Sequence, residues 1–292
     1  MLFRSSLRTG GENMADPFKI IEPTCISFSG GRTSAYMLWR VLQSHGGKLP
    51  EDAVVCFANT GKEDEATLRF VDRCSKEWDV PITWIEYKDA EETKDRWQIV
   101  DFNTASRNGE PFEAIIRKKQ YLPNPVTRFC TTDMKIRPIA NYLFSIGYCK
   151  SRSAGERLSW VGIRADEKRR AAKIERDRTP LVSAGITKED VSEFWQKQSF
   201  DLELPNFNGV TYHGNCDLCF LKGESQTRSL IAEKPERAIW WARMEALALA
   251  SKPSGAKFRR DRDSYQKMMD FAKSQTPMFD KADESIDCFC GD

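Results

Sequence analysis

Histidine and long apolar runs are the scarcest features of this sequence. His45 and His213 are the only histidines among its 292 residues, so a histidine-rich metal site or a Ser-His-Asp triad would be poorly supplied. No apolar run approaches the ~20 residues that a membrane-spanning helix requires. The apolar stretch within residues 1–17 is too short for a secretory signal. We therefore expect a cytoplasmic protein without a membrane partner.

A strong net charge and two common nucleotide-binding motifs are also missing. The formal net charge is +2, which gives no global field that would attract nucleic acid or an anionic membrane. The sequence has no GxxxxGK[ST] motif, which argues against Walker-type ATP hydrolysis, and no GxGxxG motif of dinucleotide-binding folds. Chemistry must therefore depend mainly on backbone amides, Lys and Arg, carboxylates and cysteine.

The apolar pattern of residues 18–200 predicts an α/β fold. Short apolar runs predict strands at 24–28, 53–58, 82–87 and 157–163. Helical spacing predicts helices at 35–42, 64–78, 111–120 and 133–144, with a short one beginning at 187. Alternation of strand and helix favours a Rossmann-like, doubly wound parallel sheet. Polar segments at 88–109 and 164–178 are expected to be loops.

The two ends of the chain differ from this nucleotide-binding-type domain in composition. Residues 1–17 are polar and are predicted to form a disordered tail. Residues 201–292 are expected to form a cysteine-containing helical C-terminal region, with helices at 235–250 and 260–273 and no strand after Asn206. Trp240 and Trp241 lie beside basic residues in the first of these helices. That pattern could serve a nucleic acid strand but is more typical of core packing.

The segment from Ser27 to Ser34 is the strongest functional signal. It runs from the end of a predicted strand through two glycines into a helix, and its candidate nucleotide-binding residues are Ser27, Ser29, Gly30, Gly31, Arg32, Thr33 and Ser34. Glycines allow positive φ and a close approach of the backbone to a ligand. Exposed amides at a helix N-terminus favour an anion. The alternative is a turn that only connects strand and helix.

This Ser-Gly-Gly-x-Thr-Ser loop resembles the pyrophosphate loop of the N-type ATP pyrophosphatases, the adenine nucleotide alpha hydrolase superfamily. Most of those pyrophosphatases carry Asp at Thr33 or Arg32. Further motifs resemble the phosphoadenosine phosphosulfate (PAPS) reductase family, including its phage and prophage members, and the resemblance covers roughly residues 22–222 in motif order. These motifs are 59–63 (NTGKE), 129–135 (FCTTDMK), 160–167 (WVGIRADE), and Pro180-Leu181 with Asp190-Val191.

The resemblance implies that the ligand is ATP or PAPS. It places Phe57, Asn59, Thr60 and Gly61 where the second strand approaches the nucleotide. It also places Gly162 and Arg164 at the phosphates or sulfate, where a guanidinium offers a planar, bidentate fork for oxyanions. The neighbouring cations Lys168, Arg169 and Arg170 are interpreted as a solvated charged loop.

Nine cysteines in a chain of this size indicate thiols or metal ligands rather than disulfides. Cys216 and Cys219 form a CxxC, which is a redox pair, half of a metal site or a coincidence. The resemblance implies a [4Fe–4S] cluster held by Cys130, Cys216, Cys219 and either Cys288 or Cys290, or a cluster with one open iron. Zinc or no metal are the alternatives. Cys25, Cys56 and Cys74 are expected in the core.

Three functions remain open from the sequence. The first is cleavage of ATP to AMP and pyrophosphate, which adenylylates a substrate for sulfur transfer, with a nucleic acid as a possible acceptor. The second is thiol-dependent reduction of PAPS to sulfite, with Cys288 or Cys290 as nucleophile and a thiol reductant as partner. The third is a non-catalytic nucleotide-binding module with a structural metal. Cys130, Arg164, Cys288 and Cys290 are the candidate catalytic residues, and the sequence does not indicate an oligomeric state.

Overall fold

The computed structural model describes residues 16–207, 210–251 and 253–275. Its centre is a five-stranded sheet in the order β4-β3-β2-β1-β5. The strands are β1 (Thr24–Phe28), β2 (Ala53–Asn59), β3 (Ile82–Glu86), β4 (Gln98–Val100) and β5 (Ser159–Val161). All neighbours pair in parallel except β4, which runs antiparallel to β3 at one edge. This confirms the predicted α/β class.

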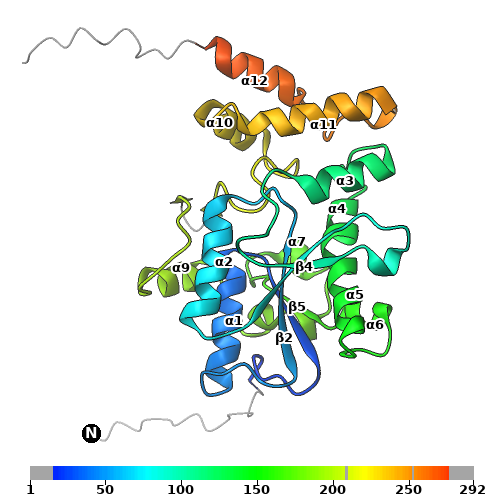
Figure 1. Ribbon diagram of the computed structural model, residues 1–292. Helices are drawn as coiled ribbons and strands as arrows, with labels where there is room; N and C mark the ends of the chain where they lie inside the picture. Colours follow the sequence, from blue (N-terminus) through cyan, green and yellow to red (C-terminus); the bar gives the residue numbers. More distant parts are fainter. Residues whose placement is uncertain (1–15, 208–209, 252, 276–292) are drawn as a thin grey trace, which may run out of the picture.

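Helices cover both faces of the sheet, because side chains on successive strand positions point to opposite sides. Figure 1 shows α1 (Arg32–Ser44) and α2 (Glu65–Glu77) on one side, with α5 (Arg137–Ser145) and α6 (Arg152–Arg157) on the other. Ile26 and Phe28 of β1 pack in the large cluster with α1 and α2. Cys25, between Ile26 and Thr24, packs on the opposite face with Ile139 and Leu143 of α5.

The remaining elements are short or belong to the C-terminal region. They are η1 (Thr93–Asp95), α3 (Glu110–Lys119), α4 (Phe129–Thr131), the π-helix η2 (Thr132–Ile136), α7 (Lys168–Ala171), η3 (Arg176–Arg178), α8 (Pro180–Ser183), α9 (Lys188–Gln196), the hairpin β6 (Asn206–Phe207) and β7 (Val210–Thr211), α10 (Glu224–Glu233), α11 (Arg237–Ser251), η4 (Pro253–Gly255) and α12 (Tyr265–Ser274). Among the described residues, no helix is both long and apolar enough to cross a membrane.

A second hydrophobic cluster joins the C-terminal helices to the α/β part. Figure 1 shows α10, α11 and α12 gathered beside α3 at one end of the molecule. Trp240 and Trp241 are buried there, and Phe112 of α3 packs against both rings. The core-packing interpretation of the two tryptophans is therefore confirmed. Their indole rings are part of a core and do not form an exposed stacking surface.

Five local predictions were wrong at the level of single elements. The expected loop 164–178 contains the short helix α7 and the 3-10 helix η3. The expected loop 88–109 contains β4, whose three residues form a strand only because β3 offers a free edge. The expected absence of strands after Asn206 is contradicted by the β6–β7 hairpin. The strand predicted at 157–163 shrinks to Ser159–Val161, because α6 extends to Arg157. The helix predicted at 133–144 begins as the π-helix η2 before becoming α5.

The predicted disordered tail lies mostly outside the described residues. Its last two residues, Asp16 and Pro17, begin the described part. The Asp16 carboxylate accepts a hydrogen bond from the amide of Phe18 at 3.0 Å, and Phe18 is fully buried. This contact ties the start of the described chain to the large hydrophobic cluster.

Candidate anion-binding site

The strand order creates a crevice at the carboxyl ends of β1 and β5. From β1 the chain passes outward to β2 and β3, then returns to add β5 on the other side of β1. Connections that leave two adjacent parallel strands in opposite directions open a crevice where ligands bind in such sheets. Phe28 ends β1 and Val161 ends β5, so the loops that follow them meet at this crevice.

The loop after β1 is shaped by its two glycines in different ways. Gly30 has a φ of +77°, and a Cβ atom there would lie 2.5 Å from Thr67 Cγ2. Gly31 is extended, with a φ of −107°, and the nearest atom to a Cβ there would be Ser29 Oγ at 3.7 Å. The fold therefore requires glycine at position 30, whereas at position 31 the missing side chain leaves open space beside the loop.

The start of α1 presents unpaired backbone donors to this space. The amides of Gly31, Arg32 and Thr33 donate no hydrogen bond to any residue that the structure describes. Unpaired N–H groups and the positive end of a helix dipole attract anions. The α1 helix has 13 residues, long enough to carry such a dipole. The geometry therefore favours the binding of an anion beside residues 29–33.

Ser34 organises the loop from within. Its hydroxyl accepts a hydrogen bond from the amide of Ser29 at 3.0 Å and donates one to the carbonyl of Gly31 at 2.9 Å. It also lies 2.9 Å from Ser29 Oγ. The Ser34 residue is buried, whereas Ser29 is exposed. Gly162 packs against this serine, because a Cβ at position 162 would lie 3.0 Å from Ser34 Cα. Of the two serines, only Ser29 is placed to meet a ligand.

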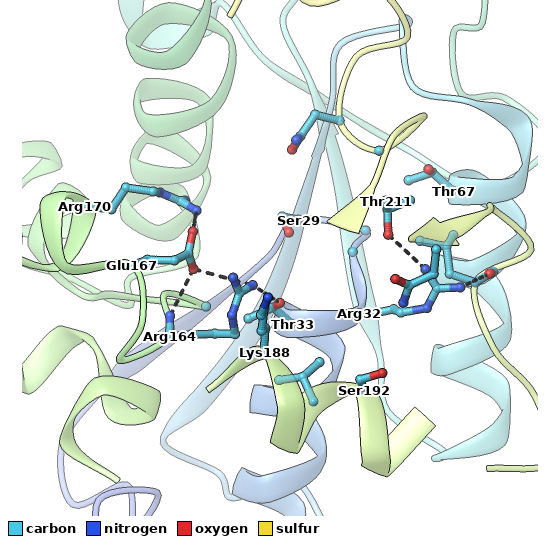
Figure 2. A pocket seen from close by; sticks show the side chains of 18 residues that line it. Ser29, Arg32, Thr33, Thr67, Arg164, Glu167, Arg170, Lys188, Ser192 and Thr211 are labelled. Carbon is cyan, nitrogen blue, oxygen red and sulfur yellow. Dashed lines mark hydrogen bonds and ion pairs between the residues drawn. The ribbon is translucent and has the colours of Figure 1, made fainter. Parts of the chain in front are cut away.

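A pocket of about 350 Å³ lies over the loop. Figure 2 shows its wall of hydroxyl and cationic side chains, and four cations but only one carboxylate line it. Its lining residues are Ser29, Gly30, Gly31, Arg32, Thr33, Thr67, Gly162, Arg164, Glu167, Arg170, Lys188, Val191, Ser192, Leu202, Asn206, Thr211, Gly214 and Asn215. Each of these four cations also pairs with a carboxylate, so the unpaired amides of the loop are the donors left for an anionic ligand.

Arg164 connects the end of β5 to the loop. Its Nη1 donates to Thr33 Oγ1 at 3.1 Å, while Nε and Nη2 each donate to the Asp166 carboxylate at 3.0 Å. The hydrogen bond from Arg164 lowers the pKa of Asp166. Glu167 accepts the amide of Arg164 at 3.1 Å and pairs with Arg170. The guanidinium thus lines the pocket beside Thr33, and its contact with phosphates or sulfate stays a prediction.

Arg32 has a different position from the one expected of a ligand-binding side chain. Its side chain is 8% exposed and forms a bidentate ion pair with Asp201. Nε and Nη2 each donate a hydrogen bond of 2.7 Å to one of the two carboxylate oxygens. It also donates to Thr211 Oγ1 at 2.9 Å and to the carbonyl of Leu202 at 2.5 Å. The side chain anchors the segment after α9 to the start of α1. Its backbone amide still faces the loop.

The residues predicted on the second strand do not line the pocket. Asn59 is fully buried and donates to Glu86 Oε1 at 2.6 Å, and Thr60 bonds to the Glu63 carboxylate at 2.9 Å. Phe57 is buried behind the loop, 3.2 Å from where a Cβ of Gly30 would lie. Gly61 turns the chain after β2 with a φ of +75°. Ser27 remains within β1, where it pairs with Cys56 and Val161.

Several pocket residues were missed or interpreted differently from the sequence. No sequence motif marked Thr67 or Lys188 as a ligand-binding residue. Lys188 was predicted only to lie near the start of a helix. Arg170 was interpreted as solvated, and it is exposed, yet it also lines the pocket through its pair with Glu167. No local pattern could have revealed these residues, because they reach the loop from elements far along the chain.

The cysteines predicted as metal ligands share one neighbourhood. Cys216 is buried, and its Sγ lies 3.4 Å from Thr60 Oγ1 and 3.9 Å from Glu63 Oε1. Cys130 and Cys219 are partly exposed and pack against the same hydrophobic cluster. Burial, followed by the charge of Cys219, raises the pKa of the Cys130 thiol. Burial, followed by the Glu63 carboxylate, raises the pKa of Cys216.

This neighbourhood does not fit a metal held by the described chain. Within residues 16–207, 210–251 and 253–275, no three His, Cys, Asp or Glu side chains are placed to hold a metal ion together. Cys288 and Cys290, predicted as nucleophiles and the latter as a ligand, lie outside the described residues. Cys25, Cys56 and Cys74 are fully buried, which confirms their expected core positions.

Comparison with known proteins gives one informative similarity. The chain is 33% identical over 203 residues to the uncharacterized nin region protein ORF290 of Escherichia phage lambda, which is 68% of this chain and 65% of that protein. The match therefore spans slightly less than two thirds of the relative's length. No protein-family model and no solved structure match the chain. The name of the phage protein assigns no activity.

Proposed function

We propose that this protein is an adenine-nucleotide-dependent enzyme of the PAPS reductase type that cleaves ATP to AMP and pyrophosphate and so adenylylates a substrate for sulfur transfer. The observation that carries the proposal is the set of unpaired amides at the start of α1, facing Arg164 across the crevice. Amides at a helix N-terminus together with a guanidinium form a recurring phosphate-binding arrangement.

The proposed chemistry uses the amides of the loop and the guanidinium of Arg164. An oxygen or other nucleophile of the acceptor bonds to the α-phosphorus of ATP, and the bond from that phosphorus to the oxygen bridging the β-phosphate breaks. The bridging oxygen leaves with pyrophosphate and keeps the electron pair. Negative charge therefore grows on the leaving pyrophosphate, and fixed donors aimed at that group stabilise the transition state. In this proposal Gly31, Arg32 and Thr33 supply amides, and Arg164 supplies the cation.

The test is a calorimetric titration of the anaerobic protein with ATP and with PAPS, followed by assays for pyrophosphate and for sulfite. We expect tighter ATP binding and release of pyrophosphate when the acceptor is supplied, with nucleic acids as the first acceptors to try. Tighter PAPS binding with thiol-dependent sulfite release would instead support reduction. ATP binding without turnover over a range of acceptors would support a non-catalytic module. Binding of neither nucleotide would refute the proposal.

Two arginine variants sharpen the test. Arg164→Ala removes a guanidinium whose Nη1 lies 3.1 Å from Thr33 Oγ1, and ATP affinity should fall at least about tenfold, as for a lost charge-assisted hydrogen bond. Arg169→Ala is the matched control, because Arg169 belongs to the same charged run but is exposed and does not line the pocket. Equal affinity losses in both variants would show that Arg164 acts only through general charge.

A further inference from the structure

One buried hydroxyl in the anion pocket has no hydrogen-bond partner. Thr67 lies in the first turn of α2 and is 2% exposed, yet its Oγ1 bonds to no other described residue. A threonine within a helix usually bonds the carbonyl three or four residues earlier, here that of Asp64 or Glu63. Buried polar groups in folded proteins nearly always have a partner, so an unpaired one calls for an explanation.

The packing of Thr67 shows that its position is defined. Its Cγ2 methyl lies against Gly30, where even an added Cβ would come within 2.5 Å. A β-branched side chain has few rotamers, so a methyl held against Gly30 also restricts the direction of the hydroxyl. The amide of Thr67 is already used, since it donates to the carbonyl of Asp64 at 2.8 Å. The hydroxyl is thus the polar group of this residue that lacks a partner among the described residues.

Thr67 differs in location from the other residues that have a buried, unpaired polar atom. Five buried side-chain atoms without a partner occur within the described residues, in Thr67, His213, Arg237, Trp240 and Arg262. Only the first of these five residues lines the pocket over the loop (Figure 2). Thr67 and the unpaired amides of α1 therefore border the same pocket, although they come from different helices.

We infer that Thr67 is a ligand-binding residue whose hydroxyl donates a hydrogen bond to an oxygen of the phosphoryl or sulfonyl group held by the loop. The inference rests on the proposed function and extends it, because it assigns α2 a direct part in recognising the anion. The hydroxyl gains its missing partner only when the ligand is bound. Thr67 therefore lowers the stability of the free protein and raises the affinity for a tetrahedral oxyanion.

Thr67→Val separates these two effects, because valine keeps the methyl against Gly30 and removes the hydroxyl. With inorganic pyrophosphate and with ATP as probes, calorimetry should show affinity about tenfold lower than wild type. Without ligand, the midpoint of thermal unfolding should equal or exceed that of wild type. Thr67→Ser retains the hydroxyl and should bind more tightly than Thr67→Val.

Thr24→Val is the matched control. Thr24 is also 2% exposed, but its hydroxyl donates to the carbonyl of Glu22 at 2.9 Å and lies outside the pocket. This variant should unfold at a lower temperature and bind the probes like wild type. Wild-type affinity in Thr67→Val, or a lower unfolding temperature with unchanged affinity, would overturn the inference alone. A wild-type protein that binds neither pyrophosphate nor any adenine nucleotide would overturn the proposed function and this inference together.

Discussion

At the scale of single residues, the two loop glycines illustrate how different physical demands select the same amino acid. Gly30 adopts a left-handed φ of +77° and leaves no room for a side chain. Gly31 has an ordinary extended backbone and space around it. The first glycine is needed by the fold, and the second is needed only if something binds beside it.

Alanine substitutions should separate these two demands. Gly30→Ala forces an L-residue into the left-handed region and onto the Thr67 methyl, so the free energy of unfolding should fall by at least about 1–2 kcal/mol. Gly31→Ala should cost less than about 1 kcal/mol but reduce pyrophosphate affinity, because its Cβ occupies the approach of the anion. Urea unfolding and pyrophosphate titration measure both quantities. Normal binding by Gly31→Ala would show that the open space is not used by a ligand.

At the scale of elements, one buried carboxylate joins α11 to α12. Glu245 on α11 is 7% exposed, and its Oε2 accepts the amide of Tyr265 at the start of α12, at 2.9 Å. Burial raises the pKa of Glu245, while hydrogen bonds from the amides of Tyr265 and Phe258 lower it in part. The net effect is a raised pKa, so folding favours the protonated form of Glu245 relative to the unfolded chain.

The sign of the resulting pH dependence follows from this shift. A carboxyl group with a raised pKa in the folded state contributes most to stability at acidic pH. That contribution is lost as the pH rises from the unfolded pKa through the folded one. Glu245→Gln should therefore raise the free energy of unfolding at pH 7, by roughly 1 kcal/mol or less, and flatten its decline above pH 4.5. Urea unfolding between pH 4 and 8 measures this, and a variant less stable than wild type at pH 7 would contradict it.

At the scale of the whole molecule, packing continues across the position where the sequence suggested a boundary, near residue 200. Leu202 and Leu204 belong to the large cluster around β1–β3. The second cluster combines Phe112 and Phe129 with side chains of the C-terminal helices such as Trp241. The two regions are therefore joined by shared apolar surface, and each covers side chains of the other.

A chain ending at residue 200 tests this coupling. The truncation would expose the apolar side chains that the C-terminal helices cover and would remove Asp201, the partner of the buried Arg32 guanidinium. Loss of apolar burial and an unpaired buried charge both destabilise strongly. Compared with the full chain, the fragment should unfold at a much lower temperature and bind an apolar dye. A cooperative transition at the full-chain temperature would show that residues 18–200 fold independently.

Local sequence patterns were enough to predict the backbone of the candidate site. The strand at 24–28, the glycine loop and the following helix are all where the pattern predicted them, because apolar periodicity and glycine geometry act over a few residues. The family resemblance placed Arg164 at the phosphates or sulfate of the ligand, and the structure places its guanidinium in hydrogen-bond contact with Thr33 of the loop. Three of the predicted cysteines also share one neighbourhood, although not with metal-binding geometry.

Long-range packing sets which side chains line the pocket over the loop and which stabilise the fold. Arg32 stands in the loop motif, yet its guanidinium binds Asp201, which lies 169 positions later in the chain. Thr67 has no motif of its own pointing to the anion, yet its side chain meets Gly30. The order in which strands join the sheet sets these contacts, and local sequence patterns carry no information about distances across it. The sequence therefore defines a backbone suited to an anion, and the fold supplies the side chains around it.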